Sequence, residues 1–262
     1  MQINLKGKTA LVCGSSQGIG RAIAIQFAKS GANVILTARN EENLKKVKLS
    51  LTQSKYQNHN YFKSDFNKPE SMLKPIENLI KEYGNINILI NNSGGPSQEL
   101  LYKEVPNIIL EAFTQHLIVS QILVKLLLPG MIATSYGRII NINSIGLKQP
   151  VENLGTSNII RAAIGSWAKT LSRELASFGI TVNNILPGFT KTERLDKLIK
   201  TEVKNSGTSI KQYSKKIQNE IPVGRFGKPD EIAFAACFLA SEYASYINGI
   251  NLPIDGGFLR TL

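Results

Sequence analysis

Cysteine and long apolar runs are both scarce in this chain. Only Cys13 and Cys237 occur in 262 residues, and their spacing fits neither a disulfide framework nor a metal site, so we predict two core residues and no metal. The longest apolar stretch, 122–131, is interrupted by Lys125 and is far too short to span a bilayer. The first six residues lack the apolar core of a secretion signal. We therefore expect a cytoplasmic protein with no membrane partner.

Acidic residues are also few, and the chain carries a formal net charge of +12. An excess of this size is compatible with nucleic-acid binding. However, the basic residues are mostly lysines spread along the whole chain, and they form no block of arginines and aromatics. This distribution favours solvated, lysine-rich helix faces. We therefore expect no nucleic-acid partner.

The most informative stretch lies near the beginning of the chain. Residues 9–13 form a short apolar run with the length of one buried strand, and helical periodicity begins at Arg21. Between them stands a glycine-rich turn, Gly14-Ser15-Ser16-Gln17-Gly18-Ile19-Gly20. A strand, such a turn and a helix direct the helix's free N–H groups and its positive dipole end toward a bound anion. The simplest anion at this place is a phosphate group.

Strand and helix patterns alternate through the rest of the chain. The predicted strands cover 33–38, 59–63, 86–90, 138–142, 181–186 and 251–254, and the predicted helices 41–54, 69–83, 106–131, 157–178 and 229–240. This alternation predicts an α/β protein with a doubly wound, Rossmann-like three-layer sandwich and a parallel sheet of about seven strands. At this length we expect residues 1–262 to form a single domain.

The end of the second predicted strand bears on cofactor preference. Enzymes that prefer NAD place a carboxylate near this point to hold the ribose 2′-hydroxyl. Here Ala38 and Arg39 follow the strand, with Ser15 and Ser16 in the nearby turn. A guanidinium with two hydroxyls suits a 2′-phosphate, so NADP(H) is favoured over NAD(H); the alternative is a surface arginine. Asp65, followed by Phe66 after the third strand, is either a turn cap or a partner for the adenine amino group.

Two further segments suggest an assembly and a cover. The helix over 106–131 is apolar almost all round, which predicts contact with the sheet on one side and with a second subunit on the other, as in a homodimer or homotetramer. Residues 189–221 hold eight basic and four acidic residues in a broken pattern. That segment is either a mobile cover over a site or a plain surface insertion.

The chain resembles the short-chain dehydrogenase/reductase superfamily over nearly its whole length. The resemblance rests on the glycine turn, on Asn91-Asn92-Ser93-Gly94, on Ser144 after the fifth strand and on Pro187-Gly188 after the sixth. Residues 221–227 and 255–257 most resemble the 3-oxoacyl-[acyl-carrier-protein] reductase branch. The resemblance implies a carbonyl or hydroxyl substrate, small or acyl-linked. It also implies that the residues of the glycine turn contact the cofactor. Further cofactor contacts are implied for Arg39, Asp65, Phe66, Asn92, Ser93, Gly94, Arg161, Pro187, Gly188 and Thr190.

The catalytic pattern of that family is not complete here. The family has a tyrosine thirteen residues after the serine and a lysine four residues later, and these positions hold Ser157 and Arg161. The family's asparagine on the long helix falls on His116. Serine is a far weaker acid than a phenol, and arginine does not shuttle protons, so cofactor binding should survive better than ordinary carbonyl reduction.

Two functions follow from this pattern. The first is an NADP(H)-dependent oxidoreductase with altered acid–base groups, namely Ser144, Ser157, Arg161 and His116. The second is a protein that holds a dinucleotide or a partner on the same fold with little or no turnover. His116 is either a replacement acid, since a histidine pKa of about 6.5 suits proton transfer near neutrality, or a packed core histidine.

Overall fold

The computed structural model describes residues 3–96 and 98–261, so Met1, Gln2, Ser97 and Leu262 lie outside the description. The strands are β1 Thr9–Cys13, β2 Asn33–Ala38, β3 Asn60–Lys63, β4 Ile88–Asn91, β5 Gly137–Ile142, β6 Ile180–Pro187 and β7 Asn251–Ile254. The α-helices are α1 Gly18–Lys29, α2 Glu41–Ser50, α3 Leu73–Tyr83, α4 Pro106–Phe113, α5 Val119–Ala133, α6 Gly155–Leu175, α7 Glu193–Ser206, α8 Ile210–Glu220 and α9 Pro229–Leu239.

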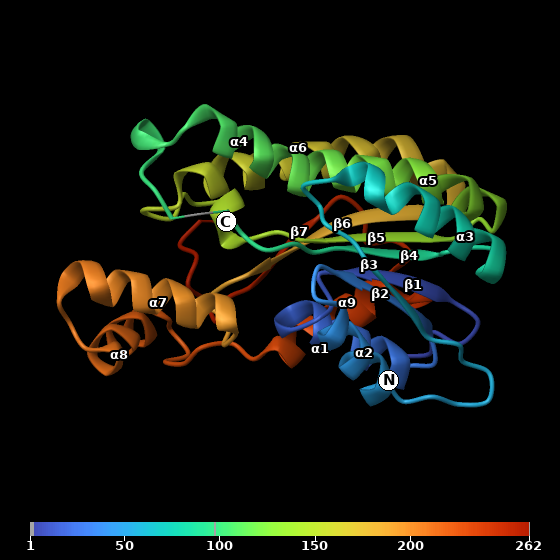
Figure 1. Ribbon diagram of the computed structural model, residues 1–262, viewed down its shortest axis with the longest axis horizontal. Helices are drawn as coiled ribbons and strands as arrows, with labels where there is room; N and C mark the ends of the chain where they lie inside the picture. The colour runs from blue at the N-terminus through green and yellow to red at the C-terminus, as the bar shows by residue number, and fades with distance from the viewer. Residues whose placement is uncertain (1–2, 97, 262) are drawn as a thin grey trace.

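All seven strands pair in parallel in the order β3-β2-β1-β4-β5-β6-β7, which confirms the predicted doubly wound sheet (Figure 1). The chain moves outward from β1 to β3 and then returns to the other side of β1 at β4. The order of the strands therefore reverses between β1 and β4. In open parallel sheets a ligand binds at the carboxyl ends of the strands beside such a reversal.

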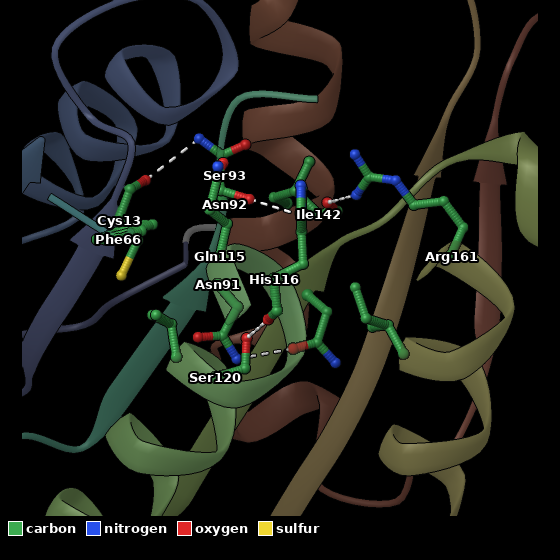
Figure 2. A pocket seen from close by; sticks show the side chains of 13 residues that line it. Cys13, Phe66, Asn91, Asn92, Ser93, Gln115, His116, Ser120, Ile142 and Arg161 are labelled. Carbon is green, nitrogen blue, oxygen red and sulfur yellow. Dashed lines mark hydrogen bonds between the residues drawn. The ribbon is translucent and has the colours of Figure 1, made fainter. Parts of the chain in front are cut away.

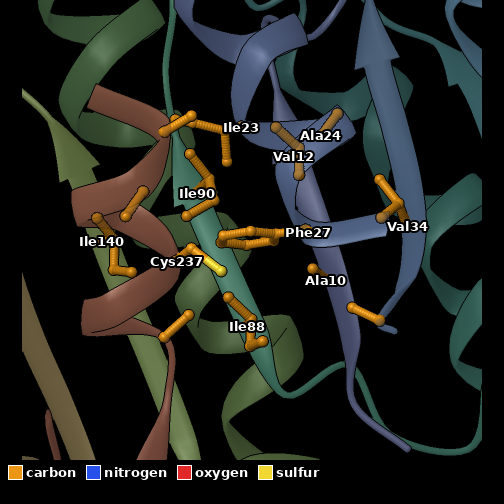
Figure 3. Close-up of a cluster of buried hydrophobic side chains, with 14 of the residues drawn as sticks. Ala10, Val12, Ile23, Ala24, Phe27, Val34, Ile88, Ile90, Ile140 and Cys237 are labelled. Carbon is orange, nitrogen blue, oxygen red and sulfur yellow. The ribbon is translucent and has the colours of Figure 1, made fainter. Parts of the chain in front are cut away.

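Helices cover both faces of the sheet, with α1, α2 and α9 on one side and α3, α5 and α6 on the other (Figure 1). Alternate side chains of one strand enter opposite cores, as Val12 joins the first and Leu11 the second. In the first core the ring of Phe27 from α1 lies beside Ile88 and Ile90 of β4 and Cys237 of α9 (Figure 3). Burial on both faces explains why these strands read as continuous apolar runs.

Several predicted boundaries differ from the structure. The predicted helix over 41–54 ends at Ser50, because Leu51 takes an extended backbone that buries its side chain. The helix predicted from residue 157 begins at Gly155. The predicted 106–131 helix is divided into α4, a π-helical turn at Thr114–Ile118 and α5. π-Turns widen a helix locally and occur frequently at functional sites; this one contains His116.

The combined helix Pro106–Ala133 is long and apolar enough to cross a membrane by length and composition alone, which corrects the expectation that no segment reaches that size. In the fold, however, Leu123, Leu127 and Met131 of α5 belong to the second core. One side of α5 therefore packs in the core as part of the layer that covers the sheet. The apolar side chains on one side of the helix pack against the sheet, and others, such as Leu110 and Ile118, are exposed.

Residues 189–221 form a helical hairpin beyond the sheet layers (Figure 1). Thr192 caps α7, and Ser209 forms a capping box with Gln212 at the start of α8. The two helices enclose a small apolar cluster of their own, Leu195, Ile199, Ile217 and Ile221. The broken sequence pattern therefore marks the turn at Gly207, where the backbone adopts a left-handed conformation. We call this hairpin the cover.

Candidate active site

A cavity of ≈ 810 Å³ runs along the carboxyl ends of the strands, between the sheet and the cover. It brings together most of the residues that the sequence singled out. These are Gly14, Ser16, Gln17, Gly18, Ile19, Arg39, Asp65, Phe66, Asn92, Ser93, Gly94, Ser144, Ser157, Arg161, Pro187, Gly188 and Thr190. The cavity therefore extends from the end of β2, past the glycine turn, to the ends of β5 and β6.

The glycine turn is packed too tightly for any side chain at two of its positions. A Cβ on Gly20 would lie 2.3 Å from the Gly14 carbonyl oxygen, and one on Gly14 would lie 2.6 Å from Asn92 Nδ2. Gly14 and Gly18 also have φ values of +57°, which L-residues with a side chain rarely adopt. Asn92 Nδ2 donates to the carbonyls of Cys13 and Gly14 at 3.2 Å each. The amide thus joins β4 to β1 at the reversal of strand order.

Two turn residues, Ser15 and Gly20, do not line the cavity, and Ser15 is the one whose side chain was expected to face the cofactor. Its side chain is fully buried, and its Oγ accepts from the Thr37 N–H at 3.0 Å and donates to the Thr37 carbonyl at 3.4 Å. The expectation that its hydroxyl faces a 2′-phosphate is therefore corrected, because the hydroxyl fastens the turn to β2. Ser16, by contrast, lines the cavity.

The end of the cavity at β2 carries Arg39 and Asp65. Arg39 is exposed and has no carboxylate beside it among the described ion pairs, so its guanidinium is available to an anion. Asp65 Oδ1 accepts from the Asn67 N–H at 3.1 Å, which is the geometry of a turn cap. The carboxylate still borders the cavity. Both expected roles of Asp65 therefore remain compatible with its position.

The opposite end of the cavity gathers Ser144, Ser157 and Arg161. The Ser144 Oγ accepts from the Gly146 N–H at 3.1 Å, which orients the hydroxyl and leaves its proton for an acceptor in the cavity. Ser157 and Arg161 stand one turn apart on α6, so both face β5. Arg161 Nη1 donates to the Ile142 carbonyl at 3.3 Å (Figure 2). Burial, aided by the charge of Arg194, lowers the pKa of Arg161 to about 10, so the guanidinium is charged at neutral pH.

His116 lines a second, much smaller cavity of ≈ 20 Å³ together with Arg161 and Asn91 (Figure 2). Its Nδ1 lies 2.7 Å from Ser93 Oγ. Burial, with help from the charge of Arg161, lowers the pKa of His116 to about 3, so the ring is neutral at pH 7. Three buried polar atoms at this cavity have no partner in the described structure: His116 Nε2, Asn91 Oδ1 and Arg161 Nε. A space of this size holds one water molecule and offers it hydrogen-bond partners.

Arg194, near the start of α7, is a cavity residue that the sequence did not single out. Its Nη2 donates to the Pro96 carbonyl at 2.6 Å, and the guanidinium lies against Gly95. The side chain therefore links the cover to the loop after β4. Nothing in its spacing distinguishes Arg194 from the other seven basic residues of the cover.

Comparisons with known proteins agree with this architecture. The sequence profile of the enoyl-(acyl carrier protein) reductase family matches residues 14–259. A 3-oxoacyl-[acyl-carrier-protein] reductase of Rickettsia prowazekii is 37% identical over 98% of this chain and 99% of its own length. The NADPH-dependent reductase BacG of Bacillus subtilis is 31% identical over 97% and 99%. A crystal structure of L-sorbose reductase from Gluconobacter frateurii, complexed with NADPH and L-sorbose, superposes with a TM-score of 0.93 at 34% identity and covers both chains fully.

Proposed function

Since this chain belongs to the short-chain dehydrogenase/reductase superfamily, we propose that it is an NADP(H)-dependent oxidoreductase acting on a carbonyl or hydroxyl compound. The observation that carries the proposal is one continuous cavity, with an anion-binding turn in the middle, Arg39 at one end and Ser144 with Arg161 at the other. The turn fits a dinucleotide because Gly14 and Gly20 let backbone approach the phosphates closely. The test is NADPH consumption by the purified protein over a panel of carbonyl compounds.

In such a reaction the residues of the cavity have different roles. The glycine turn and Arg39 would hold NADPH, which would supply the hydride for the carbonyl carbon. Ser144 donates its hydroxyl proton in a hydrogen bond to the substrate oxygen, and Arg161 stabilises the negative charge that develops there. Ser157 and Arg161 stand where the family has its tyrosine and lysine, so no phenol acts as general acid. The resulting alkoxide then takes its proton from water.

His116 has two possible parts in this scheme. As a neutral ring held by Ser93, it positions the loop after β4; as a replacement acid, it would have to gain a proton despite its low pKa. The first role predicts an unchanged pH profile in a His116→Ala variant. The second predicts that turnover falls and its pH dependence moves.

We expect NADPH to bind more tightly than NADH because of the exposed guanidinium of Arg39. An Arg39→Ala substitution should weaken NADPH binding by about tenfold, the value of one charge-assisted contact at a solvent-accessible site, and leave NADH unchanged. Calorimetric titration of both cofactors measures the effect. Equal wild-type affinities for NADPH and NADH would contradict the cofactor preference.

The alternative function is a dinucleotide-binding protein with little or no turnover. It is suggested by Ser157 and Arg161, which stand at the positions of the family's tyrosine and lysine. Without a positioned general acid, carbonyl reduction should be slower by about 100- to 10,000-fold. The two functions separate in one experiment. Tight NADPH binding without consumption over the whole panel supports the binding protein, and consumption of NADPH supports the oxidoreductase.

We also propose a cytoplasmic homo-oligomer, either a dimer or a tetramer. The long helix exposes Leu110 of α4 by 63% and Ile118 of the π-helical turn by 46%, which is unusual for apolar side chains of this size. We expect light scattering to give a dimer or tetramer at micromolar concentration. The double variant Leu110→Lys, Ile118→Lys should dissociate it, and a wild-type monomer would contradict the proposal.

A further inference from the structure

The cavity end that holds Ser144 contains two guanidinium groups without an ionic partner. Arg161 is 8% exposed and lines both cavities; its Nη1 donates to the Ile142 carbonyl, and its Nε belongs to the small cavity beside His116. Arg194 stands at the mouth of the same cavity, still open to solvent, with one nitrogen on the Pro96 carbonyl. Within residues 3–96 and 98–261 neither group forms an ion pair with a carboxylate.

Two guanidinium charges placed near each other, one of them buried, are electrostatically unfavourable without an anion beside them. A buried charge loses its hydration, and a second charge of the same sign nearby raises the cost further. The charge of Arg194 indeed acts on Arg161 and on His116. Three carboxylates border the cavity, those of Asp65, Glu111 and Glu193, and none of them is paired with either guanidinium in the described structure. A bound anion would therefore lower this electrostatic cost.

The cofactor already has other groups for its phosphates. Its pyrophosphate fits the glycine turn at the start of α1, and its 2′-phosphate fits Arg39. Arg161 lies instead at the end of β5 beside Ser144, where the reacting oxygen is expected. An anion bound here belongs to the substrate.

We propose, on the basis of the reductase function above, that the substrate is a small 2-oxo acid whose carboxylate is bound by Arg161 and Arg194. In a 2-oxo acid the carbonyl oxygen and one carboxylate oxygen lie on the same side of the molecule. A planar guanidinium fork such as that of Arg161 can contact both at once. Arg194 then covers the second carboxylate oxygen as the cover rests on the loop of Gly95 and Pro96.

The chemistry balances with water as the proton source. The hydride of NADPH goes to C2, the C=O double bond becomes a C–O single bond, and the oxygen takes one proton, so that a 2-hydroxy acid and NADP⁺ result. Arg161 supports the oxygen as its charge develops but donates no proton. Replacement of the phenol and ammonium by a serine and a guanidinium is thus consistent with a substrate that brings its own negative charge.

The test compares 2-oxohexanoate with its methyl ester and with 2-hexanone, which differ mainly in charge. We expect kcat/KM for the acid to exceed that for the ester by about 100-fold in the wild type, as for a site built to bind a charged group. Arg194→Met should lower this acid-to-ester ratio by about tenfold or more, and Arg194→Lys should restore part of it. Lys200→Met, which removes an exposed charge from the same helix outside the cavity, should leave the ratio unchanged.

Direct binding separates this inference from the function on which it rests. Calorimetry should show 2-oxohexanoate, but not its ester, binding to the protein saturated with NADP⁺, and Arg194→Met should weaken that binding about tenfold. Acid binding without any NADPH consumption would overturn the oxidoreductase and keep the carboxylate site. Turnover of ketone, ester and acid at similar kcat/KM would overturn the carboxylate site alone. If Arg194→Met weakens NADPH binding and leaves the ratio intact, Arg194 serves the cofactor and the inference is wrong.

Discussion

A Gly20→Ala variant is expected to lose NADPH binding by at least about 100-fold. The added Cβ would lie 2.3 Å from the Gly14 carbonyl oxygen, which is backbone, and 2.8 Å from Asn92 Nδ2, which two hydrogen bonds to the Cys13 and Gly14 carbonyls hold in place. The turn must open to admit the methyl group, which carries the phosphate-facing N–H groups away from their positions. Overpacking of this kind also costs about 1–3 kcal/mol of folding free energy. Calorimetric titration with NADPH and thermal unfolding measure the two effects.

Gly7→Ala is the matched control for this variant. Gly7 has a φ of +78°, and a Cβ there would meet nothing within 4 Å. Its substitution should therefore cost about 1 kcal/mol of stability through backbone strain alone, with no change in NADPH affinity. A Gly20→Ala protein that binds NADPH like the wild type would contradict the placement of the phosphates at this turn.

The second large effect is a gain of function. The double change Ser157→Tyr, Arg161→Lys should raise the reduction of uncharged ketones by about 100-fold, the lower end of what a positioned general acid contributes. Ser144 already offers its hydroxyl to the substrate oxygen, and Ser157 borders the large cavity beside Ile145 and Val151, which gives a ring somewhere to lie. Steady-state kinetics with 2-hexanone and NADPH is the measurement.

The single changes serve as controls for the double one. Either alone should gain less, because the phenol needs the ammonium nearby to become a useful acid. A further Ser144→Ala change should remove the gain, whereas His116→Ala should leave it in place if the histidine is merely packed. Strong wild-type turnover that survives Ser144→Ala, Arg161→Ala and His116→Ala would show that the chemistry lies elsewhere in the molecule.

The acyl-carrier-protein names among the relatives describe those proteins, and from the resemblance we expect this chain to differ from them at Ser157 and Arg161. If the substrate carboxylate is held by Arg161 and Arg194, the double variant should also lose preference for the acid, since lysine lacks the planar fork. The same ketone, ester and acid substrates can therefore be used to assay both the Arg194 variants and the Ser157→Tyr, Arg161→Lys variants. Loss of acid preference together with a gain on the ketone would be the combined signature.

The fold could be predicted from the sequence, and the cofactor end of the cavity is a prediction of the same kind. Both are encoded locally: the apolar runs have strand length, the glycines mark backbone that must approach an anion, and the alternation of strands and helices permits few arrangements other than a doubly wound sheet. The residues after each strand, among them Asn92, Ser144 and Gly188, could be placed together because carboxyl ends of parallel strands share one edge.

Which polar side chains form hydrogen bonds inside the fold, and which face the cavity, could be learned from the tertiary structure alone. Ser15 looks like Ser16 in the sequence, yet its hydroxyl is bonded to Thr37 on β2 while Ser16 borders the cavity. Arg194 is the one arginine among the basic residues of the cover, but its spacing does not show that the fold lays it against Gly95. The low pKa of His116 arises from burial beside Arg161. Hydrogen bonding, burial and charge depend on neighbours that are distant along the chain, so no local pattern carries them.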